Sequence, residues 1–431
     1  MKRRHFVAAA ATAAAVPASG DAPVRSKPLK VSHWGPAFYD EAEQRELTAV
    51  IESRNPFRWY AGADSKVLAF EREFAARMGT KHAVAVTSGT AALHVALAAL
   101  GIGPGDEVIL PAWTWHSCFN TIVMLGALPV IAEIDETFNI DPDDIERHIT
   151  PQTKAIMAVH LQGTPCAIDR VLAIARKHKL RVIEDCAQSV GASFNGKPLG
   201  SHGDIGIYSL QQNKSITAGE GGAVVTNDPV LFERASRFHD LGGIRPQHLT
   251  GIGKEQLNWF IGLNYKMNEF SGGVLLAQTR KLDKIIGGVR AAARRVIDGI
   301  ADLPGLELRK RPDPEGELGT GIFIGFKGKE QRDRFVAGLK AEGIPANGPS
   351  GSVILPLLPH IQNKVTLHPA WPSFNTPRGK AIQYGPESCK RTVSILERFG
   401  GPLMDPKFTK RDTDDIVAAV RKVYPAVTGR G

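Results

Sequence analysis

The chain has 431 residues, of which 43% are hydrophobic and 23% are charged, and its formal net charge is +9. This length predicts two folded domains rather than one small core. The Lys and Arg residues are interleaved with acidic residues along the chain, which disfavours a nucleic-acid-binding protein and indicates a solvated surface.

The N-terminus has the composition of an export signal. A basic start is followed by an alanine-rich apolar run over residues 6–16 and by small residues where a signal peptidase could cut, up to Ala22. Arg3 and Arg4 resemble a twin-arginine signal, which directs folded proteins out of the cytoplasm. We therefore expect residues 1–27 to be a leader and linker of an exported, periplasmic protein. The alternative is an alanine-rich tail on a cytoplasmic protein. No segment approaches the roughly 20 apolar residues of a membrane helix.

Residues 38–55 and 65–79 carry apolar residues at helical spacing. Strands and helices then alternate with short connections, which favours an α/β fold in which helices cover both faces of a parallel sheet. The expected strands are 82–86, 107–111, 128–134, 154–161 and 180–186, and the expected helices are 89–100, 117–126, 141–149 and 167–179. Ligands bind such sheets at the carboxyl ends of the strands.

The pattern changes after residue 264. Residues 267–303 predict one or two long helices that lead out of the large domain. A smaller α+β unit follows, with strands near 306–308 and 321–326 and helices at 329–342 and 413–423. Residues 350–385 are rich in Pro, Gly and Asn and predict an ordered loop or lid. We therefore predict a large domain over residues 28–285 and a small C-terminal domain over residues 286–431.

Two of the predicted strand ends carry polar groups. Ser88, Gly89 and Thr90 begin a helix, where free N–H groups could hold a phosphate, although the same residues also make a good helix cap. Asp185 and Gln188 follow another strand, and a buried aspartate needs a cationic partner such as a pyridinium nitrogen. Capping of the next element is the alternative for Asp185.

Lys214 supplies an amine nucleophile, which these two loops lack. It lies five residues after Ser209, which ends a predicted strand, and before a glycine-rich turn. A partly desolvated lysine has a lowered pKa and can form a Schiff base with an aldehyde, and the Ser209 hydroxyl could bind the same phosphate. A phosphate cradle, an aspartate and a Schiff-base lysine together match the needs of pyridoxal 5'-phosphate. The four cysteines form no metal-binding or disulfide pattern and are interpreted as small buried hydrophobes, so no metal is expected.

Six motifs in order carry a family resemblance: "VTSGTAAL", "GPGDEVILPAWTW", "VHLQG", "VIEDCAQSVGA", "SLQQNKSITAGEGGAVVTND" and "LNYKMNEF". Together they resemble the DegT/StrS-type aminotransferases, which are pyridoxal-phosphate enzymes that aminate keto sugars or keto cyclitols. The resemblance is close over residues 57–283 and weak as far as residue 424. It implies the aspartate-aminotransferase-like fold of type I, with a large cofactor-binding domain and a smaller C-terminal one.

The resemblance also implies roles for individual residues. Lys214 would bind the cofactor and move the proton, Asp185 would pair with the pyridine nitrogen, and Gln188 would lie beside the phenolic oxygen. Trp115 would stack on the cofactor ring; a place in the core is its alternative. The implied phosphate ligands are Gly89, Thr90, Ser209 and, from the neighbouring subunit of a homodimer, Asn264. His160 is open between a structural role and a substrate contact.

The expected reaction moves an amino group from L-glutamate or L-glutamine to a keto sugar or keto cyclitol. The form "SLQQNK" mildly favours the cyclitol branch. A non-catalytic accessory or sensor protein of the same fold is the alternative. A sugar dehydratase is disfavoured, because those relatives carry histidine where this chain has Lys214. The export signal conflicts with a nucleotide-sugar acceptor, because such sugars are made in the cytoplasm.

Overall fold

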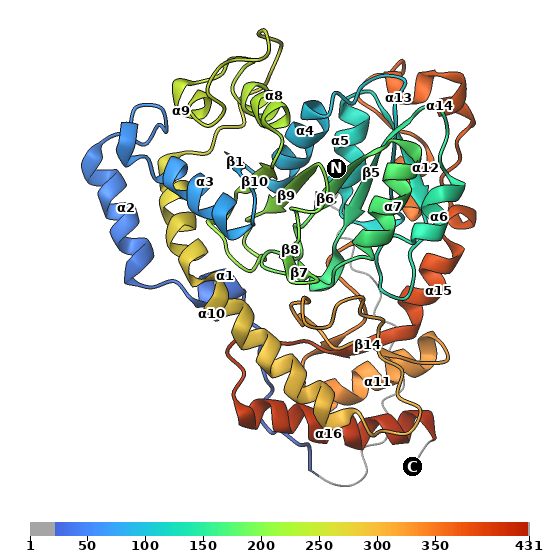
Figure 1. Ribbon diagram of the computed structural model, residues 1–431. Coiled ribbons are helices and arrows are strands. Elements are labelled where there is room, and N and C mark those ends of the chain that lie inside the picture. The colour runs from blue at the N-terminus through green and yellow to red at the C-terminus, as the bar shows by residue number, and fades with distance from the viewer. Residues whose placement is uncertain (1–21, 430–431) are drawn as a thin grey trace, which may run out of the picture.

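The computed structural model describes residues 22–429, and its large domain is built on a seven-stranded sheet (Figure 1). The strand order is β1-β10-β9-β6-β5-β2-β4. Four neighbouring pairs are parallel, whereas β10 is antiparallel to both β1 and β9. The mostly parallel sheet predicted from the sequence is confirmed. The strands are β1 (His82–Val86), β2 (Glu107–Pro111), β4 (Leu128–Ala132), β5 (Thr153–Val159), β6 (Arg181–Asp185), β9 (Ile205–Ser209) and β10 (Gly222–Thr226).

Helices cover both faces of this sheet (Figure 1). Side chains alternate between the faces along each strand. In β1, Val84 and Val86 therefore belong to one hydrophobic core, and Ala83 and Ala85 belong to the other. The first core contains α4 (Gly89–Ala99), α5 (His116–Met124) and α8 (Pro229–His239), and the second contains α3 (Lys66–Arg77), α7 (Ile168–His178) and the first half of α10 (Glu269–Ile300). The outer helices α2 (Glu41–Ser53) and α6 (Pro142–Arg147) complete the large domain.

A single 32-residue helix, α10, joins the two parts of the molecule. Its first half buries Leu282 and Ile286 in the large core, and its second half buries Val289 and Val296 in a separate core. The sequence predicted one or two long helices here, and the structure has one. The predicted domain boundary after residue 285 falls within α10, and the exact domain limits stay a prediction.

The smaller unit packs a three-stranded sheet against helices. The strands are β11 (Ile324–Gly325), β14 (Phe399–Pro402) and β12 (Ala346–Asn347), and the helices are α11 (Lys329–Ala341), α15 (Lys390–Arg398) and α16 (Lys410–Thr428). The strand expected near 306–308 is only a single bridge, between Leu308 and Ile324. The sequence did not reveal β14, because three of its four residues, "FGGP", are glycine or proline, which are poor strand formers.

Residues 350–385, the cover segment, are ordered as the sequence predicts. Within them, β13 (Val353–Ile354) pairs antiparallel with β3 (Trp113–Thr114). The indole N–H of Trp371 donates to the carbonyl of Val123 at 2.6 Å, and the Tyr384 hydroxyl donates to the carbonyl of Pro129 at 2.6 Å. Three short helices, α12 (Pro359–Gln362), α13 (Pro372–Asn375) and α14 (Pro377–Ala381), lie between these anchors. The cover segment is thus fastened to the large domain at β3, α5 and β4.

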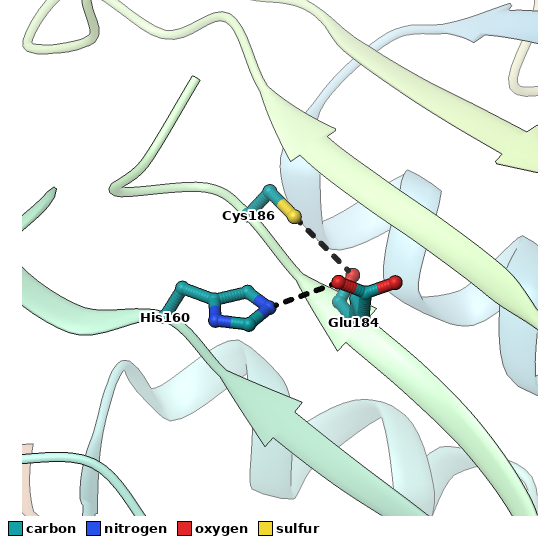
Figure 2. Close-up of side chains that lie close together, drawn as sticks. All are labelled: His160, Glu184 and Cys186. Atoms are coloured by element: carbon teal, nitrogen blue, oxygen red, sulfur yellow. Dashed lines mark hydrogen bonds and ion pairs between the residues drawn. The ribbon is translucent and has the colours of Figure 1, made fainter. Parts of the chain in front are cut away.

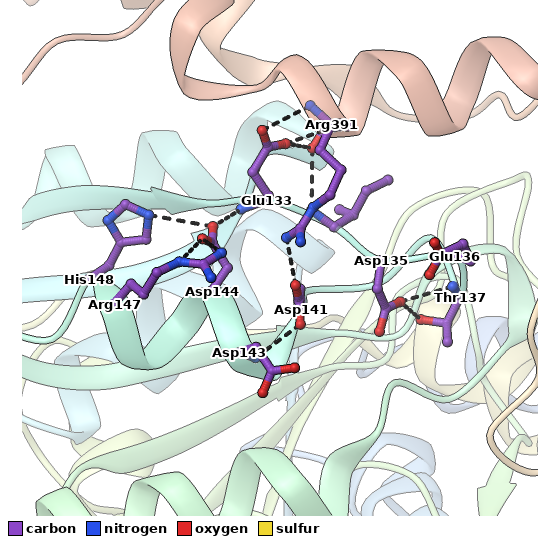
Figure 3. Close-up of polar contacts among 12 residues, drawn as sticks. Glu133, Asp135, Glu136, Thr137, Asp141, Asp143, Asp144, Arg147, His148 and Arg391 are labelled. Atoms are coloured by element: carbon purple, nitrogen blue, oxygen red, sulfur yellow. Dashed lines mark hydrogen bonds and ion pairs between the residues drawn. The ribbon is translucent and has the colours of Figure 1, made fainter.

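A polar junction also holds α15 against the large domain (Figure 3). The Glu133 carboxylate accepts the backbone N–H groups of Arg391 at 3.0 Å and Thr392 at 2.7 Å. The residue before α15 makes no side-chain hydrogen bond to the first turn of that helix. Glu133, which lies in the large domain, therefore caps the helix in its place. The Arg391 side chain forms an ion pair with Asp141 at 2.5 Å.

The loop before α3 is held by a buried ion pair. The guanidinium of Arg58 lies 2.7 Å from the Glu71 carboxylate, and both side chains are buried. Burial by itself would raise the pKa of Glu71, but Arg58 and His248 outweigh it and lower that pKa to about 2.

None of the helices within residues 22–429 is long and apolar enough to cross a membrane. The predicted leader lies almost entirely outside the described residues, so the twin-arginine signal stays a prediction.

Candidate active site

The start of α4 and the end of β9 lie in direct contact. A Cβ atom placed on Gly89 would lie 2.6 Å from the Cβ of Ser209 and 3.0 Å from its hydroxyl oxygen. The first N–H groups of a helix have no partner within that helix. Glycine at position 89 therefore lets these N–H groups and the Ser209 hydroxyl converge on one small volume.

Two more hydroxyl groups stand beside this volume. The Thr90 hydroxyl lies 2.7 Å from the Ser117 hydroxyl on α5. The structure thus brings together Gly89, Thr90 and Ser209 as the sequence predicted, and it adds Ser117. The side chain of Ser88 caps α4 by accepting the N–H of Ala91, so capping and an open helix start occur together.

Asp185 lies at the carboxyl end of β6 and is buried. Its carboxylate accepts the N–H of Ala187 at 2.9 Å and the thiol of Cys118 at 3.2 Å. Burial raises the pKa of Asp185, against the lowering effects of these two donors and of the Lys214 charge. Burial also raises the pKa of the Cys118 thiol well above its usual range, so this thiol is protonated and donates.

Lys214 is half-buried in the turn after β9. Burial lowers the pKa of its amine, while the charges of Asp185 and Glu220 act in the opposite direction. No hydrogen bond or ion pair joins the amine to any residue from 22 to 429. A desolvated amine without a fixed partner, close enough to Asp185 for their charges to interact, has the properties of a nucleophile.

Trp115 and Gln188 lie where α5 and the cover segment approach the site. Trp115 is 53% exposed, whereas Trp113 is buried, so the core interpretation applies to Trp113. The amide of Gln188 donates to the carbonyl of Gly351 at 3.2 Å and to the Ser352 hydroxyl at 2.9 Å. The predicted lid therefore touches a predicted cofactor residue directly.

Asn264 makes no side-chain hydrogen bond to the other predicted site residues within residues 22–429. It is exposed, and its side-chain oxygen accepts only the N–H of Lys266, at 3.4 Å, among the described residues. Exposed apolar side chains surround it in sequence, including Trp259 at 74% and Ile261 at 93%.

His160 has a structural role. Its Nδ1 accepts the N–H of Cys166 at 3.1 Å, and its Nε2 lies 3.2 Å from the Glu184 carboxylate (Figure 2). Burial opposes the ionisation of Glu184, but His160 and backbone donors such as the N–H of Gly203 lower its pKa. His160, Glu184 and Cys186 cluster as metal ligands could, but the histidine and carboxylate atoms are already engaged.

Sequence reasoning missed one site residue in particular. Cys118 was interpreted only as a buried hydrophobe, and it is buried, as are the other three cysteines. Its thiol, however, contacts Asp185. The available signal was its place three residues after Trp115 at the start of a helix, which puts both in the same turn.

Known proteins share this architecture. A GDP-perosamine synthase from Vibrio cholerae is 38% identical over 62% of this chain and 70% of its own length. An L-glutamine:2-deoxy-scyllo-inosose aminotransferase from Streptoalloteichus tenebrarius is 38% identical over 61% of this chain and 62% of its own length. The solved structure of an aminotransferase from Psychrobacter cryohalolentis covers 92% of this chain and 100% of its own, with a TM-score of 0.76 and 28% identity.

A model of the DegT/DnrJ/EryC1/StrS aminotransferase family matches residues 39–349. This range contains every predicted site residue, from Gly89 to Asn264. The fold agrees as well, because the type I architecture implied by the sequence is that of the solved relatives. The chain therefore belongs to the DegT/DnrJ/EryC1/StrS aminotransferase family and is a pyridoxal-phosphate-dependent enzyme.

Proposed function

We propose that the protein transfers an amino group from L-glutamate or L-glutamine to a keto sugar or keto cyclitol. The two relatives named above support this range, because one makes an amino sugar nucleotide and the other is named for a cyclitol and for L-glutamine. The observation that carries the proposal is the buried Asp185 facing the charge of the desolvated Lys214. A sensor protein and a sugar dehydratase are not favoured, since the relatives are aminotransferases.

The residues fit pyridoxal phosphate. The cradle between Gly89 and Ser209 offers N–H and hydroxyl donors to a phosphate at the positive end of α4. Asp185 is a buried carboxylate that needs a cation, which a protonated pyridine nitrogen supplies. When bound, the cofactor provides an electron sink for the carbanion formed at the α carbon of the amino donor.

Lys214 performs the covalent attachment and the proton transfer in this proposal. Its Nζ would hold the cofactor covalently before the donor binds. The same amine would act as a general base on the proton at the donor's α carbon and then, as a general acid, deliver that proton to the former aldehyde carbon of the cofactor. A lowered pKa suits this role, because it enlarges the neutral fraction of the amine at a given pH. Cys118 and the N–H of Ala187 keep the Asp185 carboxylate in one orientation.

Five residues would complete the proposed cofactor site. Trp115 would stack on the cofactor ring, Gln188 would lie beside its phenolic oxygen, and Thr90 with Ser209 would bind the phosphate. Asn264 would bind the cofactor phosphate in a neighbouring subunit, which requires a homodimer. The exposed apolar side chains near Asn264 support this, because a second copy would remove them from water.

The homodimer is tested by sedimentation. Ile261→Asp should shift the purified protein from dimer to monomer and weaken cofactor binding, because Asn264 then has no partner. Asn264→Ala should weaken cofactor binding and leave the dimer intact. A wild-type protein that sediments as a monomer with full cofactor occupancy contradicts the proposal.

The reaction is tested by absorbance. The wild-type holoenzyme should lose the band of its lysine-bound cofactor when L-glutamate or L-glutamine is added, whereas Lys214→Ala should lack that band from the start. Lys254→Ala, an exposed lysine of the same domain, serves as the control and should behave as the wild type. If none of the twenty amino acids changes the wild-type spectrum, transamination is excluded and a sensor role takes its place.

We also propose export through the twin-arginine pathway, supported by Arg3 and Arg4 before the apolar run. A pathway for folded proteins suits an enzyme that must collect its cofactor first. Mass spectrometry of the native N-terminus should show a chain that begins near residue 23, and replacing both arginines by lysine should keep the full chain in the cytoplasm. An intact N-terminus in the wild type would refute export by cleavage.

A further inference from the structure

The first turn of α5 carries a histidine that the proposed reaction does not use. His116 follows Trp115 and precedes two residues that contact the site, Ser117 beside Thr90 and Cys118 beside Asp185. His116 therefore lies within one helical turn of the groups proposed to hold the cofactor.

The cover segment brings a second histidine to the same place. His360, on α12, lies with its ring centroid 6.2 Å from that of His116, and the two ring planes are within 16° of parallel. The rings of Trp115 and His116 meet edge to face, with their centroids 5.0 Å apart. His360 and Trp115 are exposed and His116 is half-buried, so the pair is open to solvent.

Within residues 22–429, neither imidazole has a counter-ion, and no hydrogen bond or ion pair joins either ring to another residue. Burial and the neighbouring His360 lower the pKa of His116, and no carboxylate acts on it. Other histidines of the chain differ in this respect, since His160 faces Glu184 and His248 faces Glu71.

The cover segment itself carries basic residues only. Residues 350–385 contain Lys364, Arg378 and Lys380 and no Asp or Glu. Arg378 pairs with Glu107 of the large domain, whereas the Lys364 amine donates only to backbone carbonyls. The cover segment therefore brings no carboxylate of its own that would repel an anion.

We propose that His116 and His360 form a substrate subsite that binds an anionic group, either the carboxylate of the amino donor or a phosphate of the acceptor. Two imidazoles that are held together without an acid gain charge-assisted hydrogen bonds when an oxyanion lies beside the N–H edges of both rings. The identity of the two substrates rests on the proposed function, but the existence of the subsite does not. The cover segment supplies half of it, so this segment sets which substrates are accepted.

The test uses the pyridoxal-phosphate holoenzyme with two probes. Inorganic pyrophosphate, titrated by calorimetry, stands in for an acceptor phosphate. L-Glutamate, followed by the loss of the cofactor absorbance band, reports on the donor. The variants are His360→Ala, which is exposed and leaves the core untouched, and His116→Gln, with His368→Ala as a control for an exposed histidine of the cover segment that does not contact His116.

If the subsite binds an acceptor phosphate, both variants should lose at least tenfold in pyrophosphate affinity and keep the wild-type response to L-glutamate. If it binds the donor carboxylate, both should need at least tenfold more L-glutamate for half-maximal conversion, with pyrophosphate binding unchanged. Unchanged behaviour of both variants towards both probes overturns the proposal, as does an equal loss in His368→Ala. Should the wild type respond to no amino donor, the proposed function fails, and the pyrophosphate arm alone decides the subsite: weaker binding in both variants supports it, and unchanged or absent binding overturns it.

Discussion

Replacing Gly89 by alanine tests the cradle between α4 and β9 directly. The new Cβ would lie 2.6 Å from the Cβ of Ser209 and 3.2 Å from its Cα, whereas nonbonded carbons settle at about 3.5–4.0 Å. The two backbones must therefore separate by about 1 Å. Overpacking of this kind costs roughly 1–3 kcal/mol, and alanine in a helix returns at most about 1 kcal/mol. We expect a lower melting temperature and weaker cofactor binding together, because the phosphate donors move apart.

The assay is a thermal melt of the apoprotein combined with a fluorescence titration of pyridoxal phosphate. Gly89→Ala with Ser209→Gly takes away the Cβ and the hydroxyl of residue 209 that the new alanine would meet, and leaves only the contact of 3.2 Å with the Cα of that residue. This double variant should recover most of the melting temperature without recovering full cofactor affinity, since the Ser209 hydroxyl is lost. Gly287→Ala is the matched control, because its Cβ would meet nothing within 4 Å on the exposed side of α10. A Gly89→Ala protein with wild-type melting and wild-type cofactor affinity would show that the cradle is not tightly packed.

Three further predictions concern contacts outside the cradle. The pKa of Glu71 is lowered from 4.5 to about 2. The ionised carboxylate therefore contributes about 3 kcal/mol to folding stability above pH 4.5, and this contribution is lost as the pH falls towards 2. Melting temperatures measured against pH should show the loss in the wild type and not in Glu71→Gln. Cys118→Ala removes a hydrogen bond to Asp185 and should weaken cofactor binding by about 1 kcal/mol, with recovery in Cys118→Ser, and equal affinities in all three proteins would contradict that role. Glu133→Ala uncaps α15 and should cost about 1–2 kcal/mol in thermal melts, against less than about 1 kcal/mol for Arg391→Ala, whose ion pair is partly exposed; the reverse order would refute the capping role.

Local sequence patterns predicted the large domain well, because each strand and helix there satisfies its own periodicity. The alternation between residues 82 and 186 defined the strands that run through the sheet, and the positions of Asp185 and Ser209 at strand ends placed them at one edge. The small domain was harder, since β14 consists of glycine and proline next to one phenylalanine and is held by its neighbours rather than by its own propensity.

The amino-acid sequence by itself determined the family and the cofactor, and it predicted the roles of Lys214 and Asp185, because all of these depend on short motifs that keep their order along the chain. Only the tertiary structure decided that Cys118 donates to Asp185, that Gln188 holds the cover segment, and that His360 lies against His116. His116 and His360 are 244 positions apart, and no local pattern encodes a contact over that distance. It arises because β13 pairs with β3 and so carries the cover segment onto the start of α5.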